Sequence, residues 1–254
     1  MSWKVLRASV IGTSHIDSGL PCQDDCYADV IQSEGGKQSL VCIVSDGAGS
    51  AAEAATGAEI ACITARQYLE DNIDNPLLSK DKTLIEELIN QIQQSILNKS
   101  IENNKNPRDY ACTLLGAAVS DEQGVFFQIG DGAIVIFTNS KQEVVFWPVP
   151  GVYANMTNFV TDYDALDHLH YRAVDDQIEE VSLLSDGLQN LALLSKDRVP
   201  YIPFFEPMFN VLRNKMPEDC DLLNDQLEVF LKSPNVVSRT DDDKTLILAS
   251  RKMQ

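Results

Sequence analysis

Residues 39–47, SLVCIVSDG, run from an apolar segment directly into an Asp-Gly pair. The short length and β-branched residues of this run indicate a buried strand. The same arrangement returns at 125–132 (VFFQIGDG) and 181–187 (VSLLSDG), and it is inverted at 241–249 (DDDKTLILA). Because strands are rigid, they can direct carboxylates at their ends into a shared cleft. The repeats therefore predict sheets with an acidic end.

Around these segments, further apolar runs are combined with long helical patterns. Strands are expected over residues 3–12, 110–119, 124–129, 133–137, 143–147, 178–185 and 245–250. Helices are expected over residues 51–71, 82–102, 203–215 and 219–231, and residues 150–177 resemble a loop-rich insertion. Antiparallel hairpins with long helices favour an α+β layered fold. No stretch resembles a boundary, so we expect one domain over residues 1–254.

Charge and composition exclude several functional classes. The chain has 20 basic and 38 acidic residues in 254, a net charge of −18, which would repel nucleic acid and anionic membranes. This charge favours cations or cationic partners, although an acidic surface can also serve only solubility. There is no signal peptide, no apolar run long enough to span a membrane, and no disulfide-dense cysteine pattern, so we expect a cytoplasmic protein.

The acidic positions at the strand ends predict a metal centre. Asp46, Asp131 and Asp186 each follow an apolar run, Asp242 precedes one, and Asp24 follows a loop that contains Gly and Pro. Converging carboxylates repel one another unless a cation neutralises them. Mg²⁺ and Mn²⁺ prefer carboxylates, carbonyls and water, and no His-rich or Cys-rich set competes. The chemistry implied is a two-metal centre with an activated water, as used for phosphate-ester hydrolysis.

Simpler explanations stay open for each acidic position. Asp131 lies between two apolar runs, where Asp-Gly also indicates a tight hairpin. Segments that look helical follow Asp46 and Asp186, so either residue could be a helix N-cap. The acidic residues 241–243 could form a solvated turn. Sequence alone does not show whether these strand ends converge.

Six motifs follow one another in a fixed order along the chain. They are GTSH with CQD (12–15 and 22–24), VSDGAG (44–49), ACTLL (111–115), GDG (130–132), SDGL (185–188) and DDKT (242–245). In this order they resemble the motifs of the metal-dependent protein phosphatases of type 2C. YANMT (153–157), PFF (203–205) and RTDDDKT (239–245) are similar to the bacterial protein serine/threonine phosphatase C branch. The resemblance implies a β-sandwich of two mostly antiparallel sheets flanked by α-helices, with the metals at one end.

The resemblance also implies the roles of the acidic residues. Asp46 would bridge two metal ions through its carboxylate, and the Gly47 carbonyl would hold one of them. Asp186 and Asp242 would complete the ligand set of the first ion, while Asp24 would hold metal-bound water.

A weaker third ion would fit Asp131 together with Asp186. Thr113 and Thr245 are expected to support the strands rather than to act as catalysts.

The chain departs from the family pattern around the substrate. Residues 17–20 lack the phosphate-binding Arg of many relatives, and Ala48 stands where eukaryotic relatives have His. His15 could assist phosphate or donate a proton, or it could be a structural His that bonds the loop backbone. Asp243 replaces the usual Asn and adds negative charge beside the metals. Positive charge could come from three arginines elsewhere in the chain, Arg7, Arg108 and Arg239, or each of them could be an ordinary surface residue.

We therefore expect an enzyme that hydrolyses phosphoserine and phosphothreonine in proteins with a metal-activated water. Two Mn²⁺ or Mg²⁺ ions, with room for a third, are the expected cofactors, and Asp24, Asp46, Asp186, Asp242 and His15 the catalytic residues. The expected partners are a phosphorylated protein and a cognate serine/threonine kinase. The alternatives are a non-catalytic phosphoprotein-binding regulatory module, which the missing Arg motivates, and a metallophosphoesterase acting on small phosphates.

Overall fold

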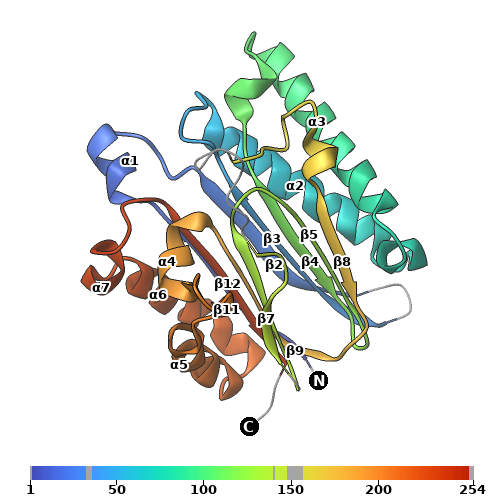
Figure 1. The fold of residues 1–254 in the computed structure, drawn as a ribbon, viewed down its shortest axis with the longest axis vertical. Helices are drawn as coiled ribbons and strands as arrows, with labels where there is room; N and C mark the ends of the chain where they lie inside the picture. Colours follow the sequence, from blue (N-terminus) through green and yellow to red (C-terminus); the bar gives the residue numbers. More distant parts are fainter. Residues whose placement is uncertain (1, 33–35, 140, 148–156, 252–254) are drawn as a thin grey trace.

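Two five-stranded antiparallel sheets form the centre of the molecule, with helices on both outer sides (Figure 1). The computed structural model describes residues 2–32, 36–139, 141–147 and 157–251. The expected α+β sandwich flanked by helices is confirmed. The resemblance placed on residues 153–156 lies outside the described residues.

The order of strands in the two sheets brings distant segments side by side. In spatial order, the first sheet contains β1 (Lys4–Val10), β12 (Lys244–Ser250), β9 (Ile178–Leu184), β6 (Ala133–Thr138) and β7 (Gln142–Val144). The second contains β2 (Asp24–Gln32), β3 (Gln38–Asp46), β4 (Leu114–Val119), β5 (Gly124–Ile129) and β8 (His170–Val174). A separate ribbon pairs β10 (Leu193–Leu194) with β11 (Val199–Pro200).

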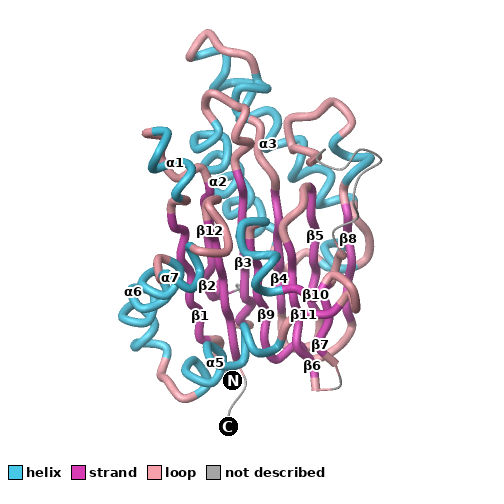
Figure 2. The backbone as a smooth tube through the Cα atoms, turned by 60° about the vertical axis from the view of Figure 1, so that its left-hand side comes forward, coloured by secondary structure: helices cyan, strands magenta, loops and turns pink. Residues whose placement is uncertain are grey.

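Each sheet has its own helical layer, and Figure 2 shows the layers from another side. The long helices α2 (Ala54–Asn72) and α3 (Thr83–Glu102) lie over the second sheet, and α5 (Ile202–Arg213) and α6 (Cys220–Leu231) lie over the first. The shorter helices are α1 (Thr13–Ser18), α4 (Gln189–Ala192) and α7 (Pro234–Val237). Single 3-10 turns are η1 (Pro76–Ser79), η2 (Pro107–Tyr110), η3 (Ala165–His168), η4 (Asp186–Leu188) and η5 (Pro217–Asp219).

Strand β3 shows why its sequence is apolar without interruption. Successive side chains of a strand point to opposite faces. Leu40 and Cys42 belong to the core between the two sheets, whereas Val41 and Ile43 belong to the core beneath α2 and α3. A strand that is buried on both faces needs apolar residues at nearly every position. Residues 39–45 therefore lie between the core that separates the two sheets and the core beneath α2 and α3.

The structure differs from the sequence prediction in several elements. The strand expected from residue 110 begins at Leu114, because residues 107–110 form η2. Strands β2 and β8 were not expected, and β8 lies inside the segment interpreted as a loop-rich insertion. None of the helices within the described ranges is long and apolar enough to cross a membrane.

Candidate metal centre

Asp24 and Asp46 meet because β2 and β3 pair. Asp24 begins β2, Asp46 ends β3, and the antiparallel register places the two directly opposite each other. The first sheet reaches the same place: β12 begins beside the end of β9, with Leu246 paired to Leu184. Asp186, which follows β9, and Asp242, which precedes β12, therefore lie at the same end of the first sheet.

Hydrogen bonds to Asp24 join the two sheets. Its Oδ2 accepts from Ser185 Oγ at 2.8 Å and from Thr245 Oγ1 at 2.7 Å. The Thr245 backbone N–H donates to Ser185 Oγ at 3.0 Å, and Ser9 Oγ lies 2.6 Å from Thr245 Oγ1. One oxygen of Asp24 is thus held by residues from β12 and the end of β9. The expected supporting role of Thr245 agrees with this geometry.

The carboxylates affect one another strongly. Burial raises the pKa of Asp46, and the negative charges of Asp24, Asp186 and Asp242 raise it further. Burial, followed by the charges of Asp131 and Asp242, raises the pKa of Asp186 to about 6. Burial also raises the pKa of Asp24 to about 7, against the opposing effect of its hydroxyl donors. Such shifts mean that the folded protein holds these carboxylates as anions only at a free-energy cost.

A divalent cation fits this donor set. Three buried oxygens at this end of the sandwich are among those without a hydrogen-bond partner in the described residues: Asp24 Oδ1, Asp186 Oδ1 and Gln23 Oε1. Buried polar atoms normally have partners, and hard cations such as Mg²⁺ and Mn²⁺ take oxygen ligands. Across the described ranges, no three His, Cys, Asp or Glu side chains are already gathered as a metal-binding group.

Gly47 occupies a crowded turn beside the carboxylates. Its backbone N–H donates to the Gln23 carbonyl at 3.1 Å, and it forms an isolated bridge with Cys112. A Cβ at this position would lie 2.6 Å from the Ala54 carbonyl oxygen. Only glycine fits here without displacing backbone.

Asp131 stands at a crossover between the sheets. The hairpin alternative is wrong, because β5 belongs to the second sheet and β6 to the first. Gly130, with φ of 114°, provides the turn. Thr157 Oγ1 donates to Asp131 Oδ2 at 2.6 Å, and the Gln189 side chain donates to the Asp131 carbonyl. Asp131 also lies close enough to raise the pKa of Asp186.

The helix N-cap alternatives are also wrong. The N-cap of α2 is Glu53, well after Asp46. Asp186 is the first residue of η4, whose N-cap is Ser185. The interpretation of residues 241–243 as a solvated turn holds only in part, because Asp243 is buried.

Asp243 fixes the first motif against the last. Its Oδ1 accepts from the Gly12 backbone N–H at 2.6 Å, and its Oδ2 accepts from the Gln23 backbone N–H at 2.6 Å. His15 Nδ1 lies 2.9 Å from the same Oδ2. The charge expected from the Asn-to-Asp departure is present, since it raises the pKa of Asp24. Three donors nevertheless surround it, and they come from segments distant in the sequence.

His15 is therefore held by a carboxylate rather than by loop backbone. Its side chain is 14% exposed, so the ring is partly accessible at the edge of the acidic site. The described residues provide no recorded partner for its second ring nitrogen. A carboxylate on Nδ1 fixes the orientation of an imidazole ring, which is compatible with a proton-transfer role.

The remaining positively charged candidates lie in different surroundings. Arg7 lies over the Tyr27 ring with its guanidinium carbon 5.5 Å from the ring centre. Arg108 is exposed in η2, and Arg239 lines a pocket between α5 and α6. Thr113 supports Asp46, whose backbone N–H donates to Thr113 Oγ1 at 3.0 Å.

Some residues of the site were missed by the sequence analysis. Ser9 and Ser185 had no predicted role, although Ser185 directly precedes Asp186 in its motif. Asp25, the residue after Asp24, lies on the opposite face of β2, where it interacts with Cys62 of α2. The strand alternation separates it from Asp24, and it does not join the centre.

Comparisons with known proteins identify the family and agree with the fold. A sequence profile described as Protein phosphatase 2C matches residues 11–232. Serine/threonine-protein phosphatase 3 of Escherichia coli K12 is 38% identical over 249 residues, which is 98% of each chain.

Solved structures of low sequence identity share the fold. A bacterial serine phosphatase has a TM-score of 0.63 at 14% identity, covering 100% of this chain and 99% of its own. The phosphatase Stp1 of Staphylococcus aureus has a TM-score of 0.59 at 14% identity, covering 99% and 96%. On the extent of the profile match and of the E. coli relative, the chain belongs to the protein phosphatase 2C family.

Proposed function

We propose that this protein hydrolyses phosphoserine and phosphothreonine in proteins, using two Mn²⁺ or Mg²⁺ ions with room for a third. The observation that carries the proposal is the set of carboxylates at or next to the ends of β2, β3, β9 and β12 at one end of the sandwich, with buried oxygens that lack partners. A cytoplasmic phosphoprotein would be the substrate, and a serine/threonine kinase would supply it.

The acidic residues of the site would have different roles in holding the metal ions and the water. Asp46, Asp186, Asp242 and the Gly47 carbonyl would hold the first two ions, and Asp131 with Asp186 the third. When bound, the ions supply an activated water and neutralise charge on the phosphoryl oxygens. Ser185 and Thr245 hold Asp24 Oδ2, which leaves Oδ1 free to orient water.

His15 would donate the proton that the leaving oxygen needs. Asp243 fixes the imidazole through Nδ1, so Nε2 is the nitrogen available for transfer. General acids of this kind matter most when the leaving group is a poor one. Phosphoserine has an alkoxide leaving group, whereas the p-nitrophenolate of p-nitrophenyl phosphate leaves readily without a proton.

The central test is phosphate release from phosphopeptides of varied sequence with Mn²⁺. Asp186→Asn should abolish release, while Asp175→Asn, an exposed change of equal charge, should preserve it. A chelator should stop the reaction and Mn²⁺ should restore it. Undiminished turnover by Asp186→Asn would refute the assignment of the site.

The role of His15 has its own test. His15→Gln should lower kcat for a phosphoserine peptide far more than for p-nitrophenyl phosphate. Equal loss on both substrates would mean that His15 only supports the loop.

The absence of Arg from residues 17–20 and the presence of Ala48 favour a second candidate, a phosphoprotein-binding module. Binding of a phosphopeptide without phosphate release would select that candidate. Turnover of small phosphates alone would instead select the metallophosphoesterase.

A further inference from the structure

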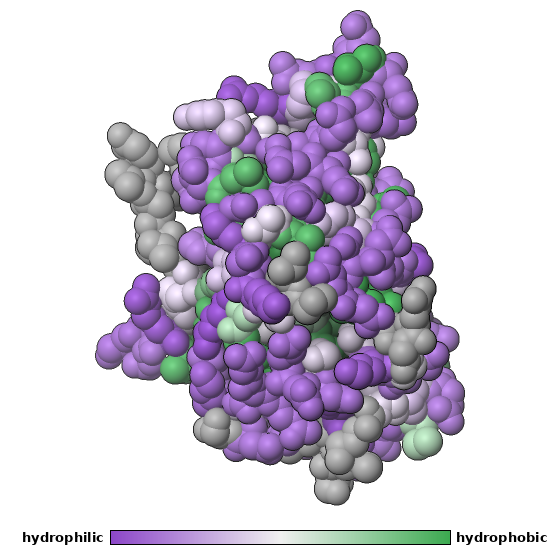
Figure 3. Space-filling view, turned by 90° about the vertical axis from the view of Figure 1, so that its right-hand side faces the viewer, coloured by the Kyte–Doolittle hydropathy of each residue, from purple (hydrophilic) through white to green (hydrophobic). Residues whose placement is uncertain are grey.

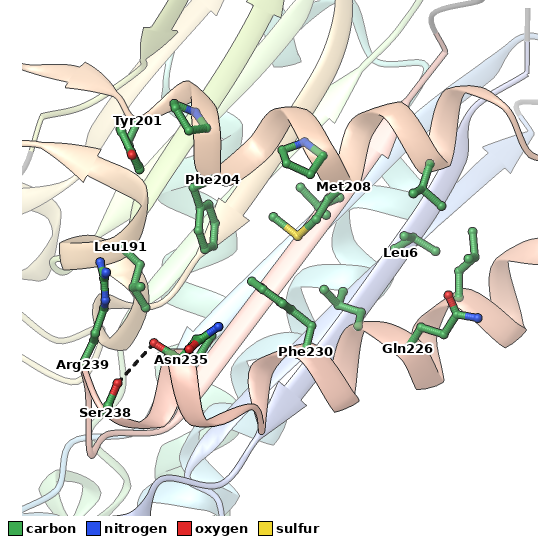
Figure 4. A pocket seen from close by; sticks show the side chains of 17 residues that line it. Leu6, Leu191, Tyr201, Phe204, Met208, Gln226, Phe230, Asn235, Ser238 and Arg239 are labelled. Carbon is green, nitrogen blue, oxygen red and sulfur yellow. Dashed lines mark hydrogen bonds between the residues drawn. The ribbon is translucent and has the colours of Figure 1, made fainter.

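An apolar pocket opens between α5 and α6, on the outer side of the first sheet (Figure 4). Its volume is about 660 Å³, which is within the range of about 300–1,000 Å³ typical of small-molecule sites. Leu6 of β1 and Leu248 of β12 contribute from the sheet, and Met208 and Leu227 contribute from the helices. None of the residues proposed to hold metal lines it.

The two ends of the pocket differ in chemistry. Figure 4 shows Arg239 at one end and Leu6 at the other, with Phe204, Met208 and Phe230 between them. The Phe204 and Phe230 rings come from α5 and α6, and their centres are 6.2 Å apart. The pocket is therefore elongated, with aromatic walls and a charged end.

Arg239 is the one charged residue among those that line the pocket. Its guanidinium forms no recorded hydrogen bond or ion pair with any residue in the described ranges. The Arg239 side chain is exposed, so its guanidinium is accessible to a ligand in the pocket. An unpaired cation at the end of an apolar pocket matches a ligand with one negative group and an apolar body.

Part of the apolar pocket wall is exposed to solvent. Tyr201, Val211 and Phe230 line the pocket and are 39%, 45% and 37% exposed. By contrast, the face seen in Figure 3 is mostly hydrophilic, with scattered apolar residues. Scattered apolar residues are ordinary on a protein surface, whereas a gathered set marks a binding site.

We propose that the pocket binds a free aliphatic monocarboxylate, with its carboxylate on Arg239 and its chain along the Phe204 and Phe230 rings toward Leu6. The net charge of the protein distinguishes specific binding of a carboxylate from non-specific binding. A net charge of −18 attracts cationic amphiphiles and repels anionic ones, so adventitious binding would favour an alkylammonium. Preference for the carboxylate requires a local cation.

Isothermal titration of the full chain with three probes of equal chain length tests this preference. Dodecanoate should bind at one site per chain, more tightly than dodecanol and dodecylammonium. Affinity should rise about fourfold for each methylene from octanoate to dodecanoate, until the chain fills the pocket. Tighter binding of dodecylammonium, or binding of dodecanol equal to that of dodecanoate, would overturn the proposal.

Variants locate the site. Arg239→Ala should weaken dodecanoate binding roughly three- to fivefold, as expected for a partly exposed charge pair, and should leave dodecanol binding unchanged. Lys232→Ala removes a cation near the end of α6 that does not line the pocket, and it should alter neither. Met208→Trp should fill the pocket and abolish binding of both probes.

Equal losses in Arg239→Ala and Lys232→Ala would overturn the proposal, as would full binding by Met208→Trp. If the protein bound anionic lipid vesicles but no monomeric dodecanoate, the surface would be a membrane contact and the proposal would be wrong.

Discussion

Asp24 and Asp46 face each other across β2 and β3 as a direct register pair. Side chains at such positions have Cβ atoms about 4.5–5.5 Å apart, and like charges there destabilise a sheet. Strand pairing, rather than a loop, sets their separation. The fold thus holds two carboxylates together at a free-energy cost, which a cation would offset.

Removing one of these charges should stabilise the metal-free protein while it abolishes activity. Asp46→Asn eliminates the group whose ionised form is opposed by burial and by Asp24, Asp186 and Asp242. We expect a higher Tm than wild type in a chelator at pH 8, together with no phosphate release in Mn²⁺. Sites that bind ligands are often less stable than they could be.

The control for that comparison is Asp175→Asn, which removes an exposed charge. An equal rise in Tm for both variants would mean that total charge, rather than the site, limits stability. A fall in Tm for Asp46→Asn would show that the carboxylate stabilises the fold.

Stability of the metal-free protein should decrease as pH rises. The pKa values of Asp186 and Asp24 are raised to about 6 and about 7, so the folded state binds these protons more tightly than the unfolded chain does. Their favourable contribution is complete below about pH 4, the ordinary aspartate value, and is lost as pH rises through 6 and 7. Thermal unfolding in a chelator between pH 5 and pH 8 measures this loss.

Mn²⁺ should raise Tm more at pH 8 than at pH 5, because protons compete with the metal at low pH. The double variant Asp24→Asn with Asp186→Asn should show a flatter pH dependence in the chelator. If its slope equals that of the wild type, the pH effect originates elsewhere on the acidic surface.

Asp243→Asn, which restores the residue usual in the family, should destabilise this particular chain. An amide offers one acceptor oxygen, whereas Asp243 accepts from Gly12, Gln23 and His15 through two oxygens. Leaving a buried donor without a partner costs about 1–3 kcal/mol. Urea unfolding should detect this loss, and Asp241→Asn, at an exposed neighbouring side chain, should change little.

Close packing of α2 depends on Gly57. A Cβ at this residue would lie 2.1 Å from the Tyr110 carbonyl oxygen, so Gly57→Ala must shift the helix or η2. Overpacking of this kind costs about 1–3 kcal/mol. Gly49→Ala is the matched control, because its Cβ would meet nothing within 4 Å. Similar unfolding midpoints for both variants would contradict this account of the packing.

Local patterns predicted those parts of the fold that are buried uniformly. Residues 124–129 form β5 with the expected bounds, and 82–102 contains α3 with its apolar face inward. Strand β2 escaped prediction because its sequence, DDCYADVIQ, mixes polar and apolar residues over partly buried positions. β8 was too short and too polar to be recognised within its segment.

The contacts of the site depended on long-range pairing that no local pattern contains. The motifs indicated Asp46 and Asp186, yet only the strand order shows that β5 and β6 separate at Asp131. The bond between Asp243 and His15 joins residues 228 positions apart. Three consecutive acidic residues at 241–243 suggest a solvated turn, and nothing in this local sequence indicates that the Asp243 side chain is buried.

The position of β12 between β1 and β9 has a consequence for synthesis on the ribosome. A nascent chain that has emerged through β9 already contains Asp24, Asp46, Asp131 and Asp186, but the first sheet still lacks the strand that joins β1 to β9, and Asp242 has not been made. β1 must wait for a partner translated more than two hundred residues later. Dephosphorylating capacity should therefore arise only after β12 has been translated, so that shorter nascent chains cannot act on phosphoproteins.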